Sequence, residues 1–163
     1  SLSSIPRHVR TAILVSEDGT FYSHAGIDWH EVQESIETNW EKGRIVRGGS
    51  TITQQLAKNL YLSTSRDPIR KFKELIITWM LEKMLSKKRI LELYLNIIEW
   101  GHGVFGIEAA AQRYFHKPAS QLTMEEGARL AAVIPSPLRH QPTENTSYVE
   151  KKKDLILRRM STR

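Results

Sequence analysis

Apolar side chains recur at every third or fourth position along most of the chain, the spacing that places them on one face of an α-helix. Alternation at every second position, which is typical of a half-buried strand, is nearly absent. We therefore expect an all-α, globular fold with a single domain over residues 1–163. The expected helices cover 6–16, 29–42, 50–62, a stretch from Pro68, 88–98, a segment ending near Phe115, a short segment after Thr123 that ends at Pro135, and 147–160.

Capping residues indicate where several of these helices begin. A short polar residue before an apolar run, with Glu three positions later, is a capping box, and Pro is favoured in the first helical turn. The signals are Asp28 with Glu31, Ser50 as an N-cap, Asp67 before Pro68, and Thr123 with Glu126.

Two helices have clearly separated faces. The helix over 50–62 carries a polar face of Thr51, Gln54, Gln55 and Lys58, opposite the apolar residues Ile52, Leu56 and Leu60. The helix from Pro68 is expected to bury Ile69, Phe72, Ile76, Trp79 and Met80. We expect the large aromatics to belong to the core and not to a ligand platform: Trp79, Trp100, Tyr114 and Phe115.

Composition narrows the classes of protein and of partner. The 163 residues include 40% hydrophobic side chains, enough for one domain with a full core. There is no cysteine, which excludes disulfides and thiolate metal sites. The net charge of +6 favours anionic partners such as phosphates or acidic lipids. No apolar stretch is long enough to span a bilayer, and because the chain begins at Ser1 we expect a membrane anchor to precede it.

The segment that ends the first helix holds the first candidate chemistry. Glu17 and Asp18 lie where a helix meets a turn, and a carboxylate there can act as a general base for a nearby hydroxyl. Taken alone, such a pair is more often a solvated helix end. His24 is by itself more often a structural hydrogen-bonding residue, and its spacing from His30 is not that of metal ligands.

A glycine turn opening into a helix forms the second candidate. Gly48 and Gly49 allow close backbone approach, the following helix start favours anions, and Lys58 lies two turns on. The order of residues is not that of a Walker A loop. A capped amphipathic helix with a solvated polar face explains the same pattern equally well.

A charged ladder on the next helix is the third candidate. Arg66, Arg70 and Glu74 recur every four residues, with Lys71 and Lys73 beside them. A surface salt-bridge ladder is the simpler interpretation. The functional interpretation is a second carboxylate held by cations that also bind a diphosphate. A base together with an anion cradle suggests transfer of a group from a phosphate.

Five segments, in this order, resemble the family 51 glycosyltransferases, which polymerise lipid II into peptidoglycan. The resemblance covers residues 5–160. The matching residues are Glu17-Asp18, Phe21, His24 and Gly26; Gly48, Ser50 through Gln55, Lys58 and Asn59; Arg70-Lys71 and Glu74; Lys88, Ile90-Leu91-Glu92 and Tyr94-Leu95-Asn96; and Gly101, Gly106, Ala109-Ala110 and Tyr114-Phe115.

The resemblance implies a lysozyme-like helical lobe beside a smaller, membrane-facing jaw. It implies an inverting transfer that forms β-1,4 linkages, in which Glu17 takes the acceptor proton and undecaprenyl diphosphate leaves. Lys58, Arg66 and Arg70 would hold the diphosphate, and Glu74 would assist on the donor side, with a divalent cation (Mg²⁺ or Mn²⁺) as an option. Further substrate contacts are expected at Asp18, Phe21, His24, Ser50, Thr51, Gln54, Gln55, Asn59 and Lys71.

The resemblance also implies a place and partners. The enzyme would act at the outer face of the bacterial cytoplasmic membrane, on lipid II and the growing glycan strand, beside other proteins of cell-wall synthesis or division. Two rival functions remain. A lysozyme-like enzyme that cleaves glycan would need Glu17 but would leave Lys58 and Arg70 unused. A basic helical module that binds nucleic acid would need its cations along one exposed face.

Overall fold

The computed structural model describes residues 1–43, 49–61 and 68–162, and these residues are helical without a named strand. An isolated bridge between Glu99 and Phe105 is the only β-type pairing among them. The all-α prediction is therefore confirmed for the described residues. The elements are η1 (Leu2–Ser4), α1 (Arg7–Glu17), α2 (Trp29–Glu41), α3 (Ile52–Tyr61), α4 (Pro68–Met84), α5 (Lys87–Ile97), α6 (Ile107–Phe115), η2 (Ala119–Gln121), α7 (Met124–Val133) and α8 (Ser147–Ser161).

The chain forms two compact units. Unit 1 comprises Ser1–Gly19 and Leu91–Arg163, and unit 2 comprises Thr20–Ile90. No helix of the described part of the chain has both the length and the apolar character needed to cross a bilayer.

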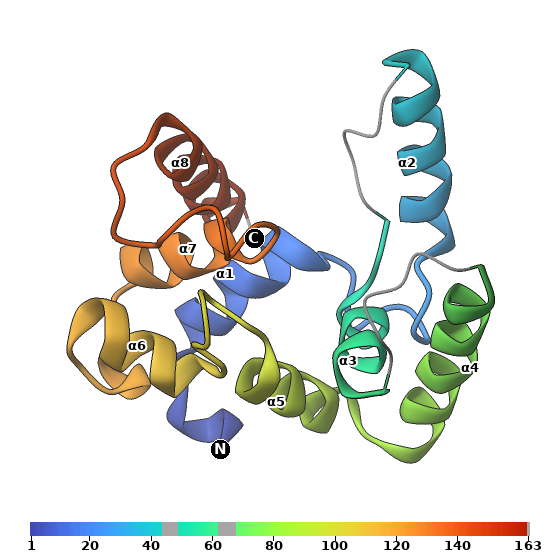
Figure 1. The fold of residues 1–163 in the computed structure, drawn as a ribbon, viewed down its shortest axis with the longest axis horizontal. Coiled ribbons are helices and arrows are strands. Elements are labelled where there is room, and N and C mark those ends of the chain that lie inside the picture. Colours follow the sequence, from blue (N-terminus) through green and yellow to red (C-terminus); the bar gives the residue numbers. More distant parts are fainter. Residues whose placement is uncertain (44–48, 62–67, 163) are drawn as a thin grey trace. The chain divides into compact units, whose positions relative to one another are not determined.

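Unit 1 is built on α1, which packs against α7 and α8 (Figure 1). Gly127 allows α7 to approach α1 closely, because a Cβ at this position would lie 3.1 Å from the Val9 Cα of α1. Trp100 is fully buried and donates its indole N–H to the Leu130 carbonyl at 3.2 Å. This confirms the core prediction for Trp100, while Tyr114 and Phe115 are only half-buried.

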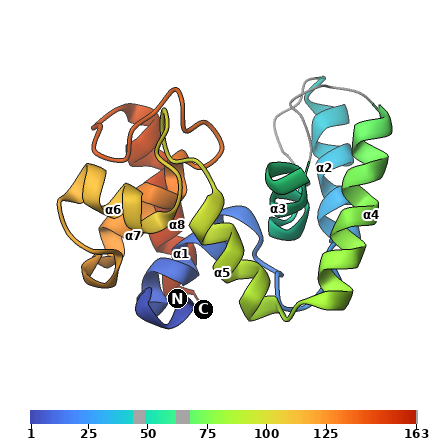
Figure 2. The same cartoon turned by 60° about the horizontal axis from the view of Figure 1, so that its bottom comes forward.

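Unit 2 is built on α3 packed against α4 (Figure 2). The loop before α2 lies on α4, and Gly26 (φ 92°) is required there. A Cβ at Gly26 would come within 2.8 Å of Thr78 and 2.9 Å of Glu82. The predicted cap of α2 is confirmed, since Asp28 accepts the Glu31 backbone N–H at 3.0 Å. In unit 1 the predicted Thr123–Glu126 capping box is likewise present at α7.

The predicted N-cap of α3 was wrong by one residue. The helix begins at Ile52, and Thr51 makes the reciprocal capping bonds with Gln54. Ser50 is exposed and precedes them. The sequence offered two adjacent hydroxyl residues, and the Gln three positions after Thr51 decides between them because it completes the box.

The predicted buried face of α4 was also wrong. The residues that α4 buries are Glu74, Thr78 and Leu81, whereas Phe72 is 64% exposed. The other exposed apolar residues of this helix are Ile69, Ile76, Trp79, Met80 and Met84. On this side of α4, Thr78 and Glu82 lie against the Gly26 loop, and Glu82 accepts a hydrogen bond from Thr53 of α3. The helix therefore turns its apolar residues outward.

Candidate active site

Glu17 is the last residue of α1, where a helix fixed by packing presents it. Val9, Ala12, Ile13 and Val15 anchor the helix in the core of unit 1. The Ser16 hydroxyl lies 2.9 Å from Glu17 Oε1 and 3.3 Å from the Ala131 carbonyl oxygen. Glu17 is half-buried, so its carboxylate is oriented by neighbours and still reaches solvent. Those are the requirements for a general base that meets a substrate hydroxyl.

Tyr94 on α5 is a neighbour of this carboxylate that sequence reasoning did not assign to the site. Its side chain is fully buried. Burial raises the pKa of the Tyr94 phenol well above its usual value of 10, and the negative charges of Glu17 and Asp18 raise it further. Tyr94 is therefore a neutral O–H group close to both carboxylates. Its place in the segment Tyr94-Leu95-Asn96 was the available signal.

The loop residues Phe21 and His24 lie within the packing of unit 2. Phe21 is 1% exposed, and the Lys87 ammonium lies 4.4 Å from its ring centroid. His24 Nδ1 accepts the Gly26 backbone N–H at 3.1 Å. These contacts hold the loop that follows Asp18.

The capping box at the start of α3 is also tied to this loop. Gln54 Oε1 accepts the Thr51 N–H at 2.9 Å, and Thr51 Oγ1 accepts the Gln54 N–H at 3.2 Å. The Thr51 hydroxyl donates to the Gly26 carbonyl at 2.6 Å. Both side chains are buried, and the Thr51 hydroxyl holds the loop to the start of the helix.

The remaining α3 residues lie nearer to solvent. Lys58 and Asn59 are exposed and Gln55 is half-buried. Lys58 has no ion-pair partner within the described parts of the chain. Lys58 therefore stays a predicted cation of the site, and the side chain of Gln54 is engaged in the capping box with Thr51.

Glu74 gathers two cations on α4. Arg70 Nη1 lies 3.2 Å from Glu74 Oε2, and Lys71 Nζ lies 2.5 Å from Glu74 Oε1. The Glu74 side chain is only 4% exposed, against 19% for Arg70. A buried carboxylate needs such pairing, because an isolated charge there would cost several kcal/mol or more. The three side chains together carry one net positive charge.

One hydrogen-bond donor of Arg70, the Nε–H group, is not used within the cluster. Its Nε is buried and has no hydrogen-bond partner in the described residues. Buried donors are almost always paired, so this N–H is a donor that a ligand oxygen or a residue outside the described ranges would satisfy. Arg66 and Gly48, which the sequence placed with this site, lie outside the described residues.

Two carboxylates of unit 2, Glu82 and Asp28, make contacts that were not predicted from the sequence. Glu82 accepts a hydrogen bond from Thr53 at 2.5 Å and pairs with Lys87 at 2.8 Å. Asp28 accepts from Thr20 as well as from its helix start. Burial alone would raise the pKa of Asp28, but the hydrogen bonds from Thr20 and the Glu31 N–H outweigh it and hold that pKa below 3.8.

The structure thus collects the predicted residues into two groups. Unit 1 carries Glu17 and Asp18 with Tyr94, and unit 2 carries Arg70, Lys71 and Glu74 on α4, with Lys58 on the packed helix α3. The first group is suited to take a proton and the second to bind an anion.

Comparison with known proteins assigns the family. The family model described as "Transglycosylase" matches residues 1–161. A biosynthetic peptidoglycan transglycosylase of Methylobacillus flagellatus is 52% identical over 94% of this chain and 67% of its own length. Proteins of the same name from Herminiimonas arsenicoxydans and Laribacter hongkongensis are 51% and 50% identical, over 68% and 69% of their lengths. A match over nearly the whole chain, with a carboxylate and a cation cluster in place, shows that the chain belongs to the transglycosylase family and is a glycosyltransferase.

Proposed function

We propose that this enzyme polymerises lipid II, with Glu17 as the base and the Arg70 cluster as the site of the departing diphosphate. The observation that carries the proposal is the Arg70–Lys71–Glu74 cluster, in which Glu74 is buried and the Arg70 Nε is unpartnered among the described residues. Bacterial cell-wall synthesis is what the printed names of the relatives describe.

On the acceptor side, the 4-hydroxyl of a sugar is a poor nucleophile near neutral pH. Glu17 would take its proton as the hydroxyl oxygen attacks C1 of the donor sugar, which inverts that carbon and gives a β-1,4 linkage. Asp18 lies beside Glu17 and is 7% exposed. We assign it to shaping the field around the base, together with Tyr94.

On the donor side, the bond from C1 to the diphosphate oxygen breaks, and negative charge accumulates on the leaving group. Diphosphate needs neutralisation more than protonation, and fixed cations aimed at developing charge are usually the largest catalytic contribution. Lys58, Arg66 and Arg70 are the residues we assign to this task. The exposed Lys58 and the unpartnered Nε of Arg70 support it.

Glu74 is best suited to position Arg70 and Lys71. Its two carboxylate oxygens are each engaged, one by Arg70 and one by Lys71. A divalent ion at Glu74 would have to displace one of these cations and would find the other beside it. The residues of this cluster therefore do not fit a Mg²⁺ or Mn²⁺ site.

The other predicted contact residues divide by burial. Ser50, Gln55 and Asn59 lie exposed or half-buried on or before α3 and remain candidates for sugar contacts. The other four residues support the site through contacts within unit 2, which engage their polar atoms and rings. They are Phe21, His24, Thr51 and Gln54.

We assign the membrane-facing jaw to unit 2. Helix α2 exposes Trp29 (71%), Ile36 and Trp40 (87%), and α4 exposes its own row of apolar side chains. The Lys83 ammonium lies 4.1 Å from the Trp79 ring centroid, an arrangement that suits a membrane interface with anionic headgroups. These faces support binding at the outer surface of the cytoplasmic membrane, where lipid II is held.

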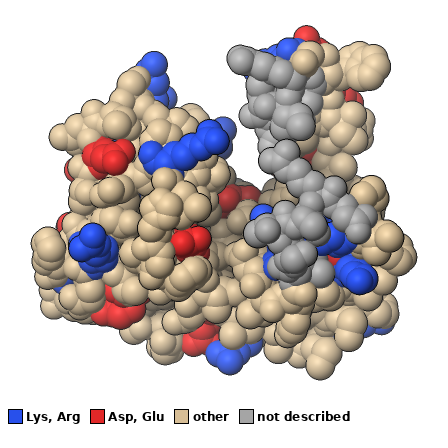
Figure 3. Space-filling view, in the orientation of Figure 1, with Lys and Arg blue, Asp and Glu red and all other residues tan. Residues whose placement is uncertain are grey.

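The rival functions fit less well. A glycan-cleaving enzyme has no use for the Arg70 cluster. A nucleic-acid module would show a stripe of cations, whereas Lys and Arg are interspersed with Asp and Glu on the face in Figure 3.

The test is incubation with labelled lipid II in detergent, followed by gel separation of the products. We expect a ladder of long strands from the wild type and none from Glu17→Gln, which keeps the side-chain volume but cannot accept a proton. Preformed glycan strands are the second arm. If wild type shortens the strands and leaves lipid II unpolymerised, the enzyme is a cleaving one and the proposal fails.

A further inference from the structure

The last turn of α7 brings a backbone carbonyl close to the residue that precedes the base. The last four carbonyls of an α-helix have no partner within the helix, and in α7 they belong to residues 130–133. The Leu130 carbonyl accepts the Trp100 indole N–H at 3.2 Å. The next carbonyl, that of Ala131, lies 3.3 Å from the Ser16 hydroxyl of α1. Both carbonyls thus meet side chains from other segments of unit 1.

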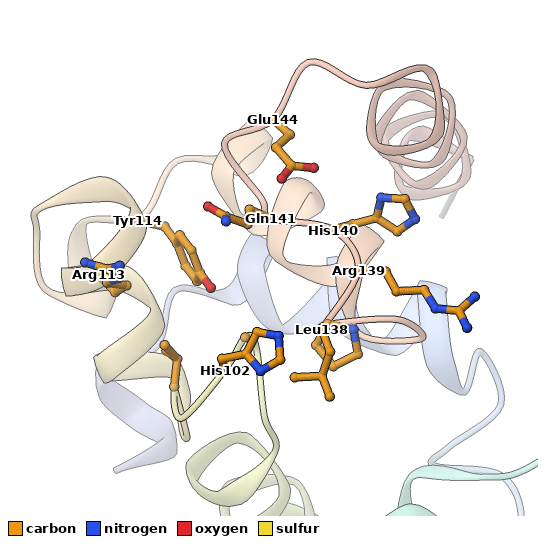
Figure 4. Close-up of a pocket in the computed structure, with 11 residues that line it drawn as sticks. His102, Arg113, Tyr114, Leu138, Arg139, His140, Gln141 and Glu144 are labelled. Atoms are coloured by element: carbon orange, nitrogen blue, oxygen red, sulfur yellow. The ribbon is translucent and has the colours of Figure 1, made fainter.

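Pro135 explains why the Ala131 carbonyl needs a partner from outside α7. A continued helix would give this carbonyl the backbone N–H of residue 135, four positions later, but proline has no N–H. The chain then leaves the helix, and residues 137–141 line a cavity of about 290 Å³ (Figure 4). The donor at the Ala131 carbonyl is therefore a side chain, and it belongs to the residue before Glu17.

The Ser16 hydroxyl has one proton and two acceptors. Its oxygen lies 2.9 Å from Glu17 Oε1 and 3.3 Å from the Ala131 carbonyl oxygen. While Glu17 is ionised, its carboxylate is the nearer and the stronger acceptor, because hydrogen bonds to an ionised group are shorter and about twice as strong as neutral ones. In this state the Ser16 proton points to Glu17.

Protonation of Glu17 reverses that preference. A carboxylic acid accepts more weakly than a carboxylate and gains an O–H donor of its own. The Ser16 hydroxyl can then turn its proton to the Ala131 carbonyl, while its oxygen accepts from the Glu17 O–H. Rotation of a single O–H bond thus gives Ser16 a hydrogen-bonded arrangement for each protonation state of the base.

We propose that Ser16 is the positioning residue of the base: its hydroxyl donates to Glu17 before the transfer and to the Ala131 carbonyl after it. In the transfer, the acceptor hydroxyl gives its proton to Glu17 and its oxygen forms the bond to C1 of the donor sugar. The bond from C1 to the diphosphate oxygen breaks with its electron pair on the diphosphate, and Glu17 later returns the proton to water. The inference rests on the proposed function for this reaction, but the Ser16 contacts do not involve the substrate.

The other titratable groups around Glu17 stay in place when only Ser16 is changed. Asp18 is adjacent in the chain. Burial raises the pKa of Tyr94 of α5, and the charges of Glu17 and Asp18 raise it further. Charged residues of α7 and α8, which pack against α1, are engaged in ion pairs with one another: Glu125, Arg129, Glu150, Lys153 and Asp154. A change of titration in a Ser16 variant therefore reports the loss of its hydroxyl.

The first test follows the Glu17 carboxyl group without substrate. Glutamate side chains are labelled with ¹³C, and the resonance that is missing in Glu17→Gln identifies Glu17. In Ser16→Ala the titration midpoint should rise by about half to one pH unit, because losing a hydrogen bond to the charged form disfavours that form. Ser16→Thr keeps the hydroxyl and should titrate as the wild type does.

A matched control and a second resonance complete this test. Thr11→Ala removes another hydroxyl of α1, which donates to the Arg7 carbonyl of its own helix, and should leave the Glu17 midpoint unchanged. The backbone carbonyl resonance of Ala131 should shift with the same midpoint as Glu17 in the wild type and lose this dependence in Ser16→Ala. An unchanged Glu17 midpoint in Ser16→Ala, or an Ala131 carbonyl that does not follow Glu17, would overturn the proposal.

The second test separates this inference from the proposed function through the pH dependence of lipid II polymerisation. In Ser16→Ala the acid limb of kcat/KM should shift with the carboxyl titration. On the plateau kcat should fall about threefold to tenfold with KM little changed, a part of the roughly 10²–10⁴-fold that a well-placed general base contributes. A shifted titration with an unshifted acid limb contradicts Glu17 as the base, and so the proposed function, whereas an unshifted titration contradicts the role of Ser16.

Discussion

The side chains of the site are positioned by contacts with neighbouring residues, and many of these contacts cannot be predicted from the sequence. Glu17 was predicted to be the base from the resemblance to family 51 glycosyltransferases, with its place at the end of the first helix in agreement. Tyr94 lies 77 positions after Glu17 (94 − 17), and nothing in local spacing connects the two. Their proximity is evident only in the folded unit, through the effect of Glu17 and Asp18 on the pKa of Tyr94.

Tyr94 should make stability depend on alkaline pH. Its folded-state pKa is raised, so the phenol ionises first in the unfolded chain, near pH 10. Above that pH the unfolded state binds fewer protons than the folded state, and the free energy of unfolding falls, by at most about 1.4 kcal/mol per pH unit. Tyr94→Phe should lose this dependence. Thermal melts between pH 8 and 11 measure it, and equal slopes for both proteins would contradict the assignment.

Glu74→Gln should lower turnover more than lipid II binding. The amide cannot pair both cations, so Arg70 and Lys71 lose their fixed positions beside the leaving group. We expect kcat to fall about tenfold or more, the range for a misplaced electrostatic group, with Glu74→Asp retaining part of the activity. Unchanged kcat at saturating substrate would make Glu74 a stabilising ion-pair partner only.

At the scale of elements, the helical pattern predicted which segments are helices but not which face each helix buries. For α1 and α3 the apolar stripe packs inward, as expected, except at Leu60, which is exposed. For α4 it does not: the buried residues are Glu74, Thr78 and Leu81, and Glu82 bonds Thr53 of α3. A 3.6-residue period shows that apolar and polar side chains lie on opposite faces of a helix. It does not indicate whether the apolar face packs against protein or against lipid.

The capping box of α3 leads to a stability prediction. Gln54→Ala removes the acceptor of the Thr51 N–H and leaves that buried donor unpaired, which costs about 1 kcal/mol or more. The midpoint of thermal unfolding should drop by about 2–4 °C. Ser50→Ala should leave it unchanged because Ser50 is not the cap. A drop for Ser50→Ala with none for Gln54→Ala would contradict the assignment of Thr51 as the N-cap.

The exposed faces of α2 and α4 predict membrane attachment. Trp40→Glu and Trp79→Glu each remove an exposed large side chain worth about 1.5–3 kcal/mol when buried, so partitioning onto anionic vesicles should fall about tenfold or more. Met124→Glu, at an exposed apolar residue of unit 1, is the matched control. Vesicle co-sedimentation measures the change, and equal losses for all three would indicate a general charge effect.

At the scale of the whole molecule, the central claim is that defined cations, and not overall basicity, drive the transfer. The net charge of +6 attracts any anionic surface, and losing one distant exposed cation changes this attraction little at physiological salt. A cation fixed at the diphosphate acts on the transition state itself. The two effects therefore differ in size by more than an order of magnitude in rate.

The most direct measurement is the initial rate of lipid II polymerisation, in detergent at fixed ionic strength, for Lys58→Met, Arg70→Met and Lys151→Met. Each variant removes one positive charge, and Lys151 is exposed on α8 in unit 1. We expect Lys58→Met and Arg70→Met to lose about 100-fold or more and Lys151→Met to remain near the wild-type rate. Similar small losses in all three variants would contradict the assignment of a diphosphate site to Lys58 and Arg70.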